Sequence, residues 1–299
     1  MSYVEPAIKL NFDDVLLKPK RSTLTSRASV DLNRTITFRH SPKTFTGIPI
    51  MAANMDGVGT FAMAKVLQEF NCLTVIKKHY SLDEWKEAIG HGVKLSHIAV
   101  CTGANMIHDP KAEDYHNMKK ILEQWPDINY ICIDVANGYQ EAFSSFVARV
   151  RKEYPDKVII AGNVITPEMT EQLIIRGADI VKCGIGPGSV CTTRTMTGVG
   201  YPQISGIMEW ADAAHGLGGS VIADGGCRTP GDVSKAFAAG ADFVMLGGML
   251  AGHEECELEL VNGSYEFYGM SSDRAMEEHG VRKSGYKGAE GKVVYLPDR

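Results

Sequence analysis

The sequence lacks several patterns that would assign a class directly. No apolar run approaches the roughly 20 residues that cross a bilayer, and the first residues contain no apolar core typical of a secretory signal peptide. The seven cysteines form no CxxC pair, and an odd number cannot all pair within one chain. No GxGxxG fingerprint opens a βαβ unit, so a dinucleotide is not held in Rossmann fashion. We therefore expect a cytoplasmic protein with reduced thiols.

The chain also has little excess of charge of either sign. Its formal net charge is −5, from 31 basic and 36 acidic residues. Such a balance gives no long-range attraction to nucleic acid or to an anionic membrane, and we expect neither as a partner. An anionic ligand would have to be held by a local site, for which backbone amides would suffice. An apolar content of 44% is ordinary for a globular enzyme with a large core.

Short β-branched runs recur along the chain, and amphipathic stretches lie between them, which is typical of parallel strands joined by crossover helices. Eight such units favour closure into a barrel. The sequence therefore predicts the α/β class and a (β/α)8 TIM barrel in a single catalytic domain, 1–299, with an N-terminal extension at 1–45. The expected strands are 48–56, 72–79, 97–104, 130–138, 158–164, 180–186, 220–226 and 243–249.

Several of the expected helices carry start and stop signals. Ser81, Thr166 and Thr229 precede helical stretches as capping hydroxyls. Gly177 and Gly240 follow two helices at positions that need a left-handed residue. After the last expected strand, however, residues 262–299 are rich in glycine, serine and charge, and no eighth helix is evident. Either the chain is shorter than the natural one or the barrel closes in another way.

Catalytic residues of such barrels lie on the loops that follow the strands. Polar and glycine-rich segments gather at these positions here. They are Asn54 to Asp56, Lys78-His79, Asp134 to Gly138, Gly184 to Arg194, Asp224 to Gly226 and Gly247-Gly248.

The loop that contains Cys191 stands out among these segments. It reads GIGPGSVCTTRTMTGVGYPQ and spans 184–203. Its glycines permit positive φ and close backbone approach, so backbone dipoles can face a ligand or an ion. A cysteine in that setting can ionise and act as a nucleophile. Composition alone supports a flexible loop with an incidental thiol equally well.

This loop resembles the catalytic loop shared by IMP dehydrogenases and GMP reductases. Supporting matches run along almost the whole chain and include LNFDDVLLKPKRST, PIMAANMD, KKHYS, CIDVANGY, AGNVIT, DGGCRTPGDVSKAFAAGADFVMLGGMLAGHE and FYGMSS. Within that family the chain is more similar to the GMP reductases. The spacing between Lys78 and Cys101 leaves no room for the tandem CBS pair of IMP dehydrogenases, and the active-site flap, 262–292, lacks their water-activating Arg-Tyr pair.

The resemblance implies NADPH-dependent reductive deamination of GMP to IMP and ammonia, a step of purine nucleotide salvage. Cys191 would add to C2 of GMP to form a covalent thioimidate, and Thr193 with Glu290 would relay protons. Substrate-binding positions carried over are Asp224, Gly225, Gly226, Gly247, Gly248, Gly269, Met270, Ser271, Lys287, Gly288 and Gly291. Cofactor-binding positions are Ser26, Arg27, Lys78, Asp134, Val135, Ala136, Ile185 and Gly186.

The resemblance further implies a monovalent cation, K⁺, held by loop oxygens of Gly186, Gly188, Cys191 and Arg194. Ser26 and Arg27 would reach the cofactor of a neighbouring subunit, which implies a homotetramer.

Two departures from the family pattern concern Lys287, where Arg is usual, and Lys77, where His is usual. Two other functions stay open. An IMP dehydrogenase without CBS domains would reduce NAD with IMP as substrate. A catalytically silent purine-nucleotide-binding barrel would bind GMP without turnover.

Overall fold

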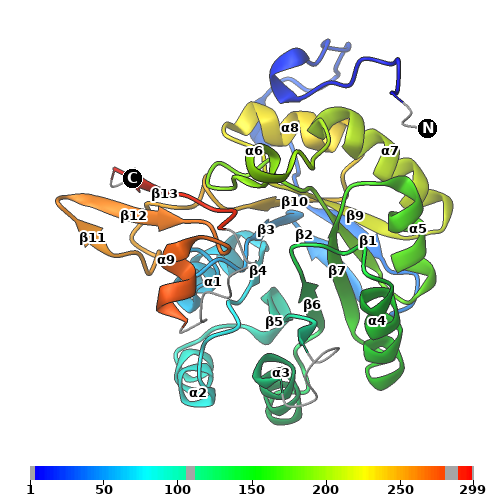
Figure 1. Ribbon diagram of the computed structural model, residues 1–299. Coiled ribbons are helices and arrows are strands. Elements are labelled where there is room, and N and C mark those ends of the chain that lie inside the picture. The colour runs from blue at the N-terminus through cyan, green and yellow to red at the C-terminus, as the bar shows by residue number, and fades with distance from the viewer. Residues whose placement is uncertain (1–3, 106–111, 280–288, 298–299) are drawn as a thin grey trace.

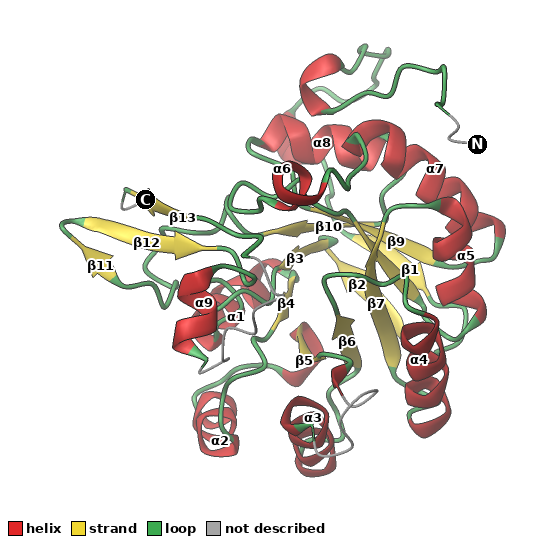
Figure 2. Cartoon of the chain, in the orientation of Figure 1, coloured by secondary structure: helices red, strands yellow, loops and turns green. Residues whose placement is uncertain are grey.

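In the computed structural model, residues 4–105, 112–279 and 289–297 are described. Eight parallel strands form a closed barrel in the order β10-β3-β4-β5-β6-β7-β8-β9. Crossover helices surround it, as in a (β/α)8 barrel (Figures 1 and 2). The barrel strands are β3 (Ile50–Ala52), β4 (Leu73–Val75), β5 (Ile98–Thr102), β6 (Tyr130–Asp134), β7 (Val158–Val164), β8 (Ile180–Cys183), β9 (Ser220–Asp224) and β10 (Phe243–Leu246).

All eight expected strands are confirmed, although most are shorter than predicted. The difference lies at their carboxyl ends, where the predicted ranges ran into the loops that form the site. The crossover helices are α1 (Phe61–Leu67), α2 (Leu82–Gly90), α3 (Glu113–Gln124), α4 (Glu141–Glu153), α5 (Pro167–Ile175), α7 (Gln203–Gly216) and α8 (Pro230–Ala238). Among the described residues, no helix combines the length and apolar character needed to cross a membrane.

The predicted helix signals are present in the structure. The hydroxyls of Ser81, Thr166 and Thr229 each accept a hydrogen bond from a backbone N–H in the first turn of α2, α5 and α8. Gly177 and Gly240 have φ of 114° and 112° after α5 and α8. Such backbone conformations are strained for residues with a side chain, so glycine ends these helices and lets the chain turn back into the next strand.

The barrel closes without an eighth crossover helix. β10 pairs directly with β3, with Val244 opposite Ile50 and Leu246 opposite Ala52. Residues 247–259, all described, contain no helix. The chain then enters the flap, where β11 (Leu260–Val261), β12 (Ser264–Tyr268) and β13 (Val293–Leu296) form an antiparallel sheet beside the short helix α9 (Asp273–Glu278). The eight strands therefore close the barrel by direct pairing of β10 with β3.

The N-terminal extension packs against the barrel at two places. Its first part lies along α7 and α8, where Lys9 forms an ion pair with Glu209 at 2.7 Å (Figure 1). Its second part forms the hairpin β1 (Arg34–Thr37) and β2 (Thr44–Gly47). Phe45 of β2 packs edge to face on Phe243, at the amino end of β10. The hairpin therefore covers the end of the barrel opposite the site.

Two apolar layers hold the barrel together. Alternate strand residues fill the interior, including Leu73, Cys132, Ile160 and Phe243. The other face of each strand packs against the crossover helices, where Trp85 and Trp210 are fully buried. This alternation sends every second residue at the carboxyl ends of the strands into the mouth of the barrel.

The buried carboxylate of Asp179, which precedes β8, joins α4, β7 and the extension. It accepts backbone N–H groups of His40, Ser41 and Ile159 at 2.8–3.1 Å and pairs with Arg151 at 2.5 Å. Its side chain has no exposed surface. Removing one partner of a buried ion pair leaves the other charge without compensation.

We therefore expect Asp179→Ala to lower the free energy of unfolding by about 3–5 kcal/mol. Urea denaturation followed by circular dichroism measures this change. Asp212→Ala, at an exposed position of α7, is the matched control and should change stability by no more than about 0.5 kcal/mol. Equal losses in the two variants would contradict this account.

Candidate active site

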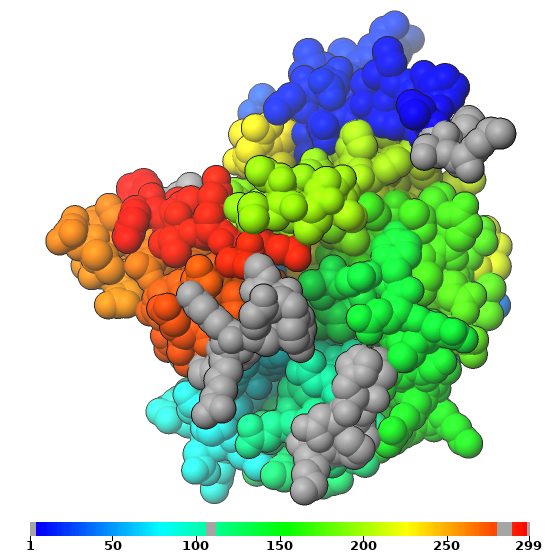
Figure 3. All heavy atoms as spheres, viewed as in Figure 1, coloured from blue at the N-terminus to red at the C-terminus, as the bar shows by residue number. Residues whose placement is uncertain are grey.

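A cavity of about 400 Å³ lies at the carboxyl ends of the barrel strands, between the strand loops and the flap. In Figure 3 the red residues near the C-terminus lie against the yellow-green segment that follows Cys191. Many of the predicted site residues line this cavity. They are Lys78, Asp134, Val135, Ala136, Ile185, Gly186, Gly188, Cys191, Thr193, Asp224, Gly225, Gly269, Met270, Ser271 and Glu290.

Cys191, Thr193 and Glu290 form a continuous chain of polar contacts. The Cys191 thiol donates to the Thr193 hydroxyl at 3.2 Å, and that hydroxyl donates to Glu290 Oε2 at 2.7 Å. Cys191 is partly exposed, whereas five of the other six cysteines are buried. A proton leaving the thiol therefore has a hydrogen-bonded path to a carboxylate, as a general base requires.

The flap is hydrogen-bonded to the cysteine loop along its backbone. Thr192 N donates to Glu290 O at 2.8 Å, and Lys292 N donates to Val190 O at 2.9 Å. Cys191 and Gly291 form an antiparallel bridge between these contacts. A Cβ at Gly291 would lie 2.9 Å from Ser272 N, so glycine is required for this close approach. These contacts bring Glu290 to Thr193 although 97 residues separate them in sequence.

A buried charge cluster lies at the bottom of the cavity. Lys182 Nζ is 3.2 Å from Asp134 Oδ1 and 2.8 Å from Asp224 Oδ2. It also donates to Asn163 Oδ1 at 2.8 Å. Asn163 in turn donates to Asp224 at 2.7 Å, and Asn54 donates to Asp134 at 2.7 Å. The two carboxylates predicted to contact cofactor and substrate are thus held by one ammonium group and two amides.

The pKa values in this cluster follow from its charges. Burial alone lowers the pKa of Lys182, but the charges of Asp134 and Asp224 outweigh burial and raise it well above the usual value. Burial likewise raises the pKa of Asp134, yet the charge of Lys182 and the hydrogen bond from Asn54 bring it below the usual value. Lys182 and Asp134 are therefore charged at neutral pH.

Sequence analysis missed Lys182, Asn163 and His279, which also line the cavity. A signal for Lys182 was available, because a lysine inside the apolar run IVKCGIG must be paired once the strand is buried. Asn54 and His79 were noted among the loop clusters but were given no role. His279 has no comparable signal, because its place depends on how the flap packs.

The two predicted glycine pairs occupy different positions relative to the cavity. Gly225 and Gly226 have φ of 81° and 87°, and Gly225 lines the cavity. Gly226 packs near Phe12 and Pro187. Gly247 and Gly248 follow β10 outside the cavity lining, where a Cβ on Gly248 would lie 2.9 Å from Ser189 Oγ.

The predicted cation ligands lie on one loop. The carbonyl oxygen of Gly188 accepts a hydrogen bond from Cys191 N at 3.1 Å, and that of Arg194 accepts one from Gly198 N at 3.1 Å. Each of these hydrogen bonds occupies one of the two lone pairs of its carbonyl oxygen. The Arg194 side chain lies against the same loop and donates to Ile185 O and Tyr201 O. Backbone carbonyls are hard donors, and their chemistry fits an alkali cation.

Ser26 and Arg27 lie away from the cavity. Both are exposed in the N-terminal extension, where Ser26 caps a short 3-10 helix, Arg27–Ser29. The structure therefore does not bring this pair into the site of the same chain. Lys287 and Gly288 lie outside the described residues.

We expect Lys182→Met to lower the free energy of unfolding by about 3–5 kcal/mol at pH 7, because two carboxylates lose their counter-ion. The loss should shrink as the pH falls below about 4, where the carboxylates bind protons instead. Urea denaturation at pH 7 and at about pH 3 tests both parts. Lys152→Met, at an exposed position of α4, is the control. A loss that grows on acidification would contradict the assignment.

Comparisons with known proteins agree with this geometry. Residues 9–296 match the family described as IMP dehydrogenase / GMP reductase domain. The chain is 57% identical over 302 residues to proteins named GMP reductase from Yersinia pestis (strain Pestoides F) and Yersinia pseudotuberculosis serotype O:1b (strain IP 31758). Each alignment covers 99% of this chain and 85% of the relative. The chain therefore belongs to the IMP dehydrogenase/GMP reductase family of enzymes.

Proposed function

We propose that the chain is a GMP reductase, an oxidoreductase that converts GMP to IMP and ammonia with NADPH. The observation that carries the proposal is the contact chain from Cys191 through Thr193 to Glu290 at the cavity wall. The name shared by relatives that are 57% identical supports the choice of substrate.

The chemistry begins at the Cys191 sulfur. Its proton passes to Thr193 and on to Glu290, and the thiolate forms a bond to C2 of the purine. The C2–N bond then breaks, and the amino group departs as ammonia after it receives a proton from the same relay. The product of this half-reaction is a covalent thioimidate on Cys191. Release of the thiolate after reduction at C2 gives IMP and restores the free enzyme.

The cavity residues fit a reduced nicotinamide dinucleotide. The charged Asp134 can accept hydrogen bonds from ribose hydroxyls, and Val135 and Ala136 follow it along the cavity wall. Lys78 provides a cation on the cavity lining, with its Nζ 3.9 Å from Asp114. When bound, NADPH supplies the hydride for C2. A preference for NADPH over NADH is part of the proposal.

Other cavity residues fit the nucleotide. Asp224 presents a carboxylate for the ribose hydroxyls, and Gly269, Met270 and Ser271 would contact the purine. Gly225, with its positive φ, leaves the backbone open to a phosphate. Gly226, Gly247 and Gly248 would act in the same way from just outside the cavity lining. Gly291, Lys287 and Gly288 would complete the purine contacts from the flap.

Two further elements of the proposal concern assembly and ions. Carbonyl oxygens of Gly186, Gly188, Cys191 and Arg194 would hold K⁺ and so stiffen the cysteine loop. Ser26 and Arg27 are exposed, which suits contact with a neighbouring subunit, and we propose a homotetramer. Size-exclusion chromatography with light scattering tests the assembly.

The decisive assay follows absorbance at 340 nm with GMP and either NADPH or NADH, together with ammonia release. GMP reductase activity requires both signals. Formation of XMP from IMP with reduction of NAD would instead identify an IMP dehydrogenase. Calorimetric binding of GMP without either reaction would identify a silent nucleotide-binding barrel.

Cys191→Ala should lower kcat by about 10⁴-fold or more, because the thiol that forms the thioimidate is lost. The 340 nm assay measures this loss, and mass spectrometry of the quenched wild-type enzyme should detect the nucleotide adduct on Cys191. Cys72→Ala is the matched control. Its thiol is buried outside the cavity lining, so kcat should stay within about twofold of wild type. Retained activity in Cys191→Ala would overturn the mechanism.

A further inference from the structure

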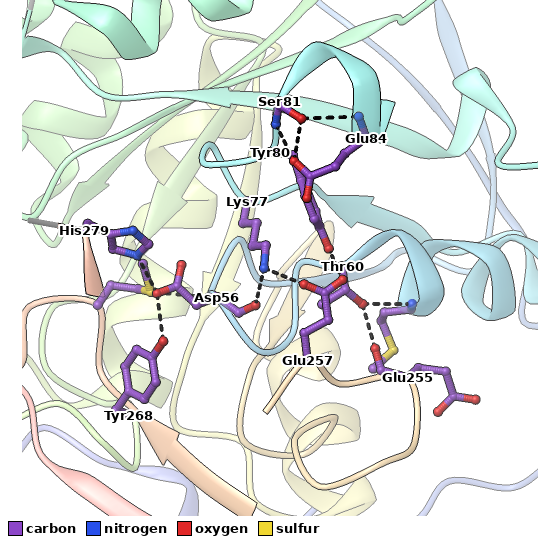
Figure 4. A network of polar contacts seen from close by, with 12 residues as sticks. Asp56, Thr60, Lys77, Tyr80, Ser81, Glu84, Glu255, Glu257, Tyr268 and His279 are labelled. Carbon is purple, nitrogen blue, oxygen red and sulfur yellow. Dashed lines mark hydrogen bonds and ion pairs between the residues drawn. The ribbon is translucent and has the colours of Figure 1, made fainter. Parts of the chain in front are cut away.

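The flap has a second point of attachment, at the loop that follows β3. Asp56 follows β3 and is 6% exposed. Its Oδ2 accepts hydrogen bonds from the Tyr268 hydroxyl at 3.1 Å and from His279 Nε2 at 2.7 Å. Tyr268 ends β12 and His279 follows α9, so both donors belong to the flap. Figure 4 shows both side chains pointing at Asp56.

Within the described part of the chain, Tyr268 and His279 are the only hydrogen-bond donors to the Asp56 carboxylate, and its Oδ1 is buried without a partner. A buried carboxylate without donors is costly. The flap contacts therefore satisfy a charge that the barrel alone leaves unsatisfied, and the barrel favours the flap position that supplies them.

The barrel loops hold Asp56 in place. Its backbone oxygen accepts Lys77 Nζ at 3.2 Å, and Lys77 also pairs with Glu257 at 2.5 Å (Figure 4). The Asp56 backbone N–H donates to the Met270 sulfur at 3.4 Å. Asp56 is thus a fixed point, and it touches the segment predicted to contact the purine.

Two ring systems complete the contact. Burial and the charge of Asp56 raise the pKa of Tyr268, so its hydroxyl keeps its proton and donates it. The His79 ring stacks on the His279 ring with centroids 3.5 Å apart and planes 12° apart. Burial is the main reason that the pKa of His79 is lowered to about 4, and the nearby His279 and Lys78 lower it further. The His79 ring is therefore neutral at pH 7. A neutral imidazole can stack there without adding charge repulsion.

A short path of hydrogen bonds and backbone leads from Asp56 to the Cys191 thiol. Gly269 O accepts Ser272 N at 2.9 Å, which shapes the turn after Tyr268. In that turn Ser271 O accepts Glu290 N at 3.1 Å. Glu290 then contacts Thr193, which contacts Cys191. A shift of Tyr268 and His279 away from Asp56 would therefore move the backbone that holds Glu290.

We propose that Asp56 is a positioning residue that fixes the flap over the cavity through Tyr268 and His279 and thereby places Glu290 against Thr193. The placement of Glu290 by Asp56 does not depend on what the substrate is. Its effect on turnover rests on the proposed function. Asp56 itself takes no part in bond making.

Alkylation of Cys191 tests the structural part without a substrate. Apo protein is treated with iodoacetamide, and mass spectrometry follows the peptides that contain Cys191 and Cys132. Cys132 lies in the barrel interior with no exposed surface and reports global loosening. The flap lies against Cys191 through Gly291, so loosening the flap should expose the thiol. Asp56→Ala should therefore speed alkylation of Cys191 by about 10-fold and leave the alkylation rate of Cys132 unchanged. Tyr268→Phe and His279→Gln should each speed it by about threefold.

The variants should also combine in a characteristic way. Once Asp56 is alanine, adding Tyr268→Phe or His279→Gln should have no further effect, because the shared acceptor is gone. Tyr295→Phe is the matched control, since this exposed flap tyrosine bonds Glu266 through its hydroxyl at 3.5 Å. It should leave the Cys191 rate unchanged. The isosteric Asp56→Asn serves in place of Asp56→Ala if that variant does not fold.

Turnover supplies the second readout. With GMP and NADPH, Asp56→Ala should lower kcat by about 10–50-fold and raise KM for GMP by only a few-fold, because Glu290 is displaced more than the binding groups. Equal alkylation rates in Asp56→Ala and Tyr295→Phe would overturn the proposal, as would equal acceleration at Cys191 and Cys132. If wild type does not turn over GMP, the proposed function fails while the alkylation result still decides the role of Asp56.

Discussion

The ammonium group of Lys182 is the constraint on which the mouth of the barrel depends. Two carboxylates, Asp134 and Asp224, lie on different strands and face the same buried space. Without a cation between them their repulsion and desolvation would favour protonation of one or both. Lys182 contacts both carboxylates, fixes their side chains and keeps Asp134 charged. In the proposed function the cofactor and the nucleotide then meet groups whose charge and direction are set in advance.

The second constraint is that the proposed catalytic groups come from distant parts of the chain. Cys191 and Thr193 lie on the loop after β8, whereas Glu290 lies on the flap. The backbone pairing around Gly291 brings them together, and Asp56 holds Tyr268 and His279 at a second place. The flap is therefore attached to two barrel loops, and the described residues between the two attachments carry the purine contacts proposed above.

Most of the barrel was predictable from the sequence because its signals are local. Alternating apolar runs gave eight strands, and capping hydroxyls and left-handed glycines gave the ends of helices, as Thr166 and Gly177 show around α5. The cysteine loop was equally visible from its glycines. The roles of Lys182 and His279 were not predicted, because each depends on side chains from distant segments. The predicted strands run too far at their carboxyl ends, because a loop that lines a site can continue the apolar pattern of the strand before it.

The segment after β10 shows how the barrel stays closed without a final helix. Ala251 and Cys256 of this segment pack with Val58 and Met63 in a small apolar cluster. Thr60 donates to Glu255 O at 2.7 Å, and Tyr80 donates to Glu257. Packing and polar contacts thus join 247–259 to the loops after β3 and β4, which is the position where the barrel closes.

The unusual Lys77 belongs to this same junction. Its ammonium group contacts Glu257 and lies 4.5 Å from the centre of the Tyr80 ring. It lines no part of the cavity, unlike its neighbour Lys78. Lys77 therefore supports the backbone of Asp56 through this junction. In the proposed function the reaction is carried by the groups around Cys191, and the contacts of Lys77 concern how firmly the loop that holds the flap is supported.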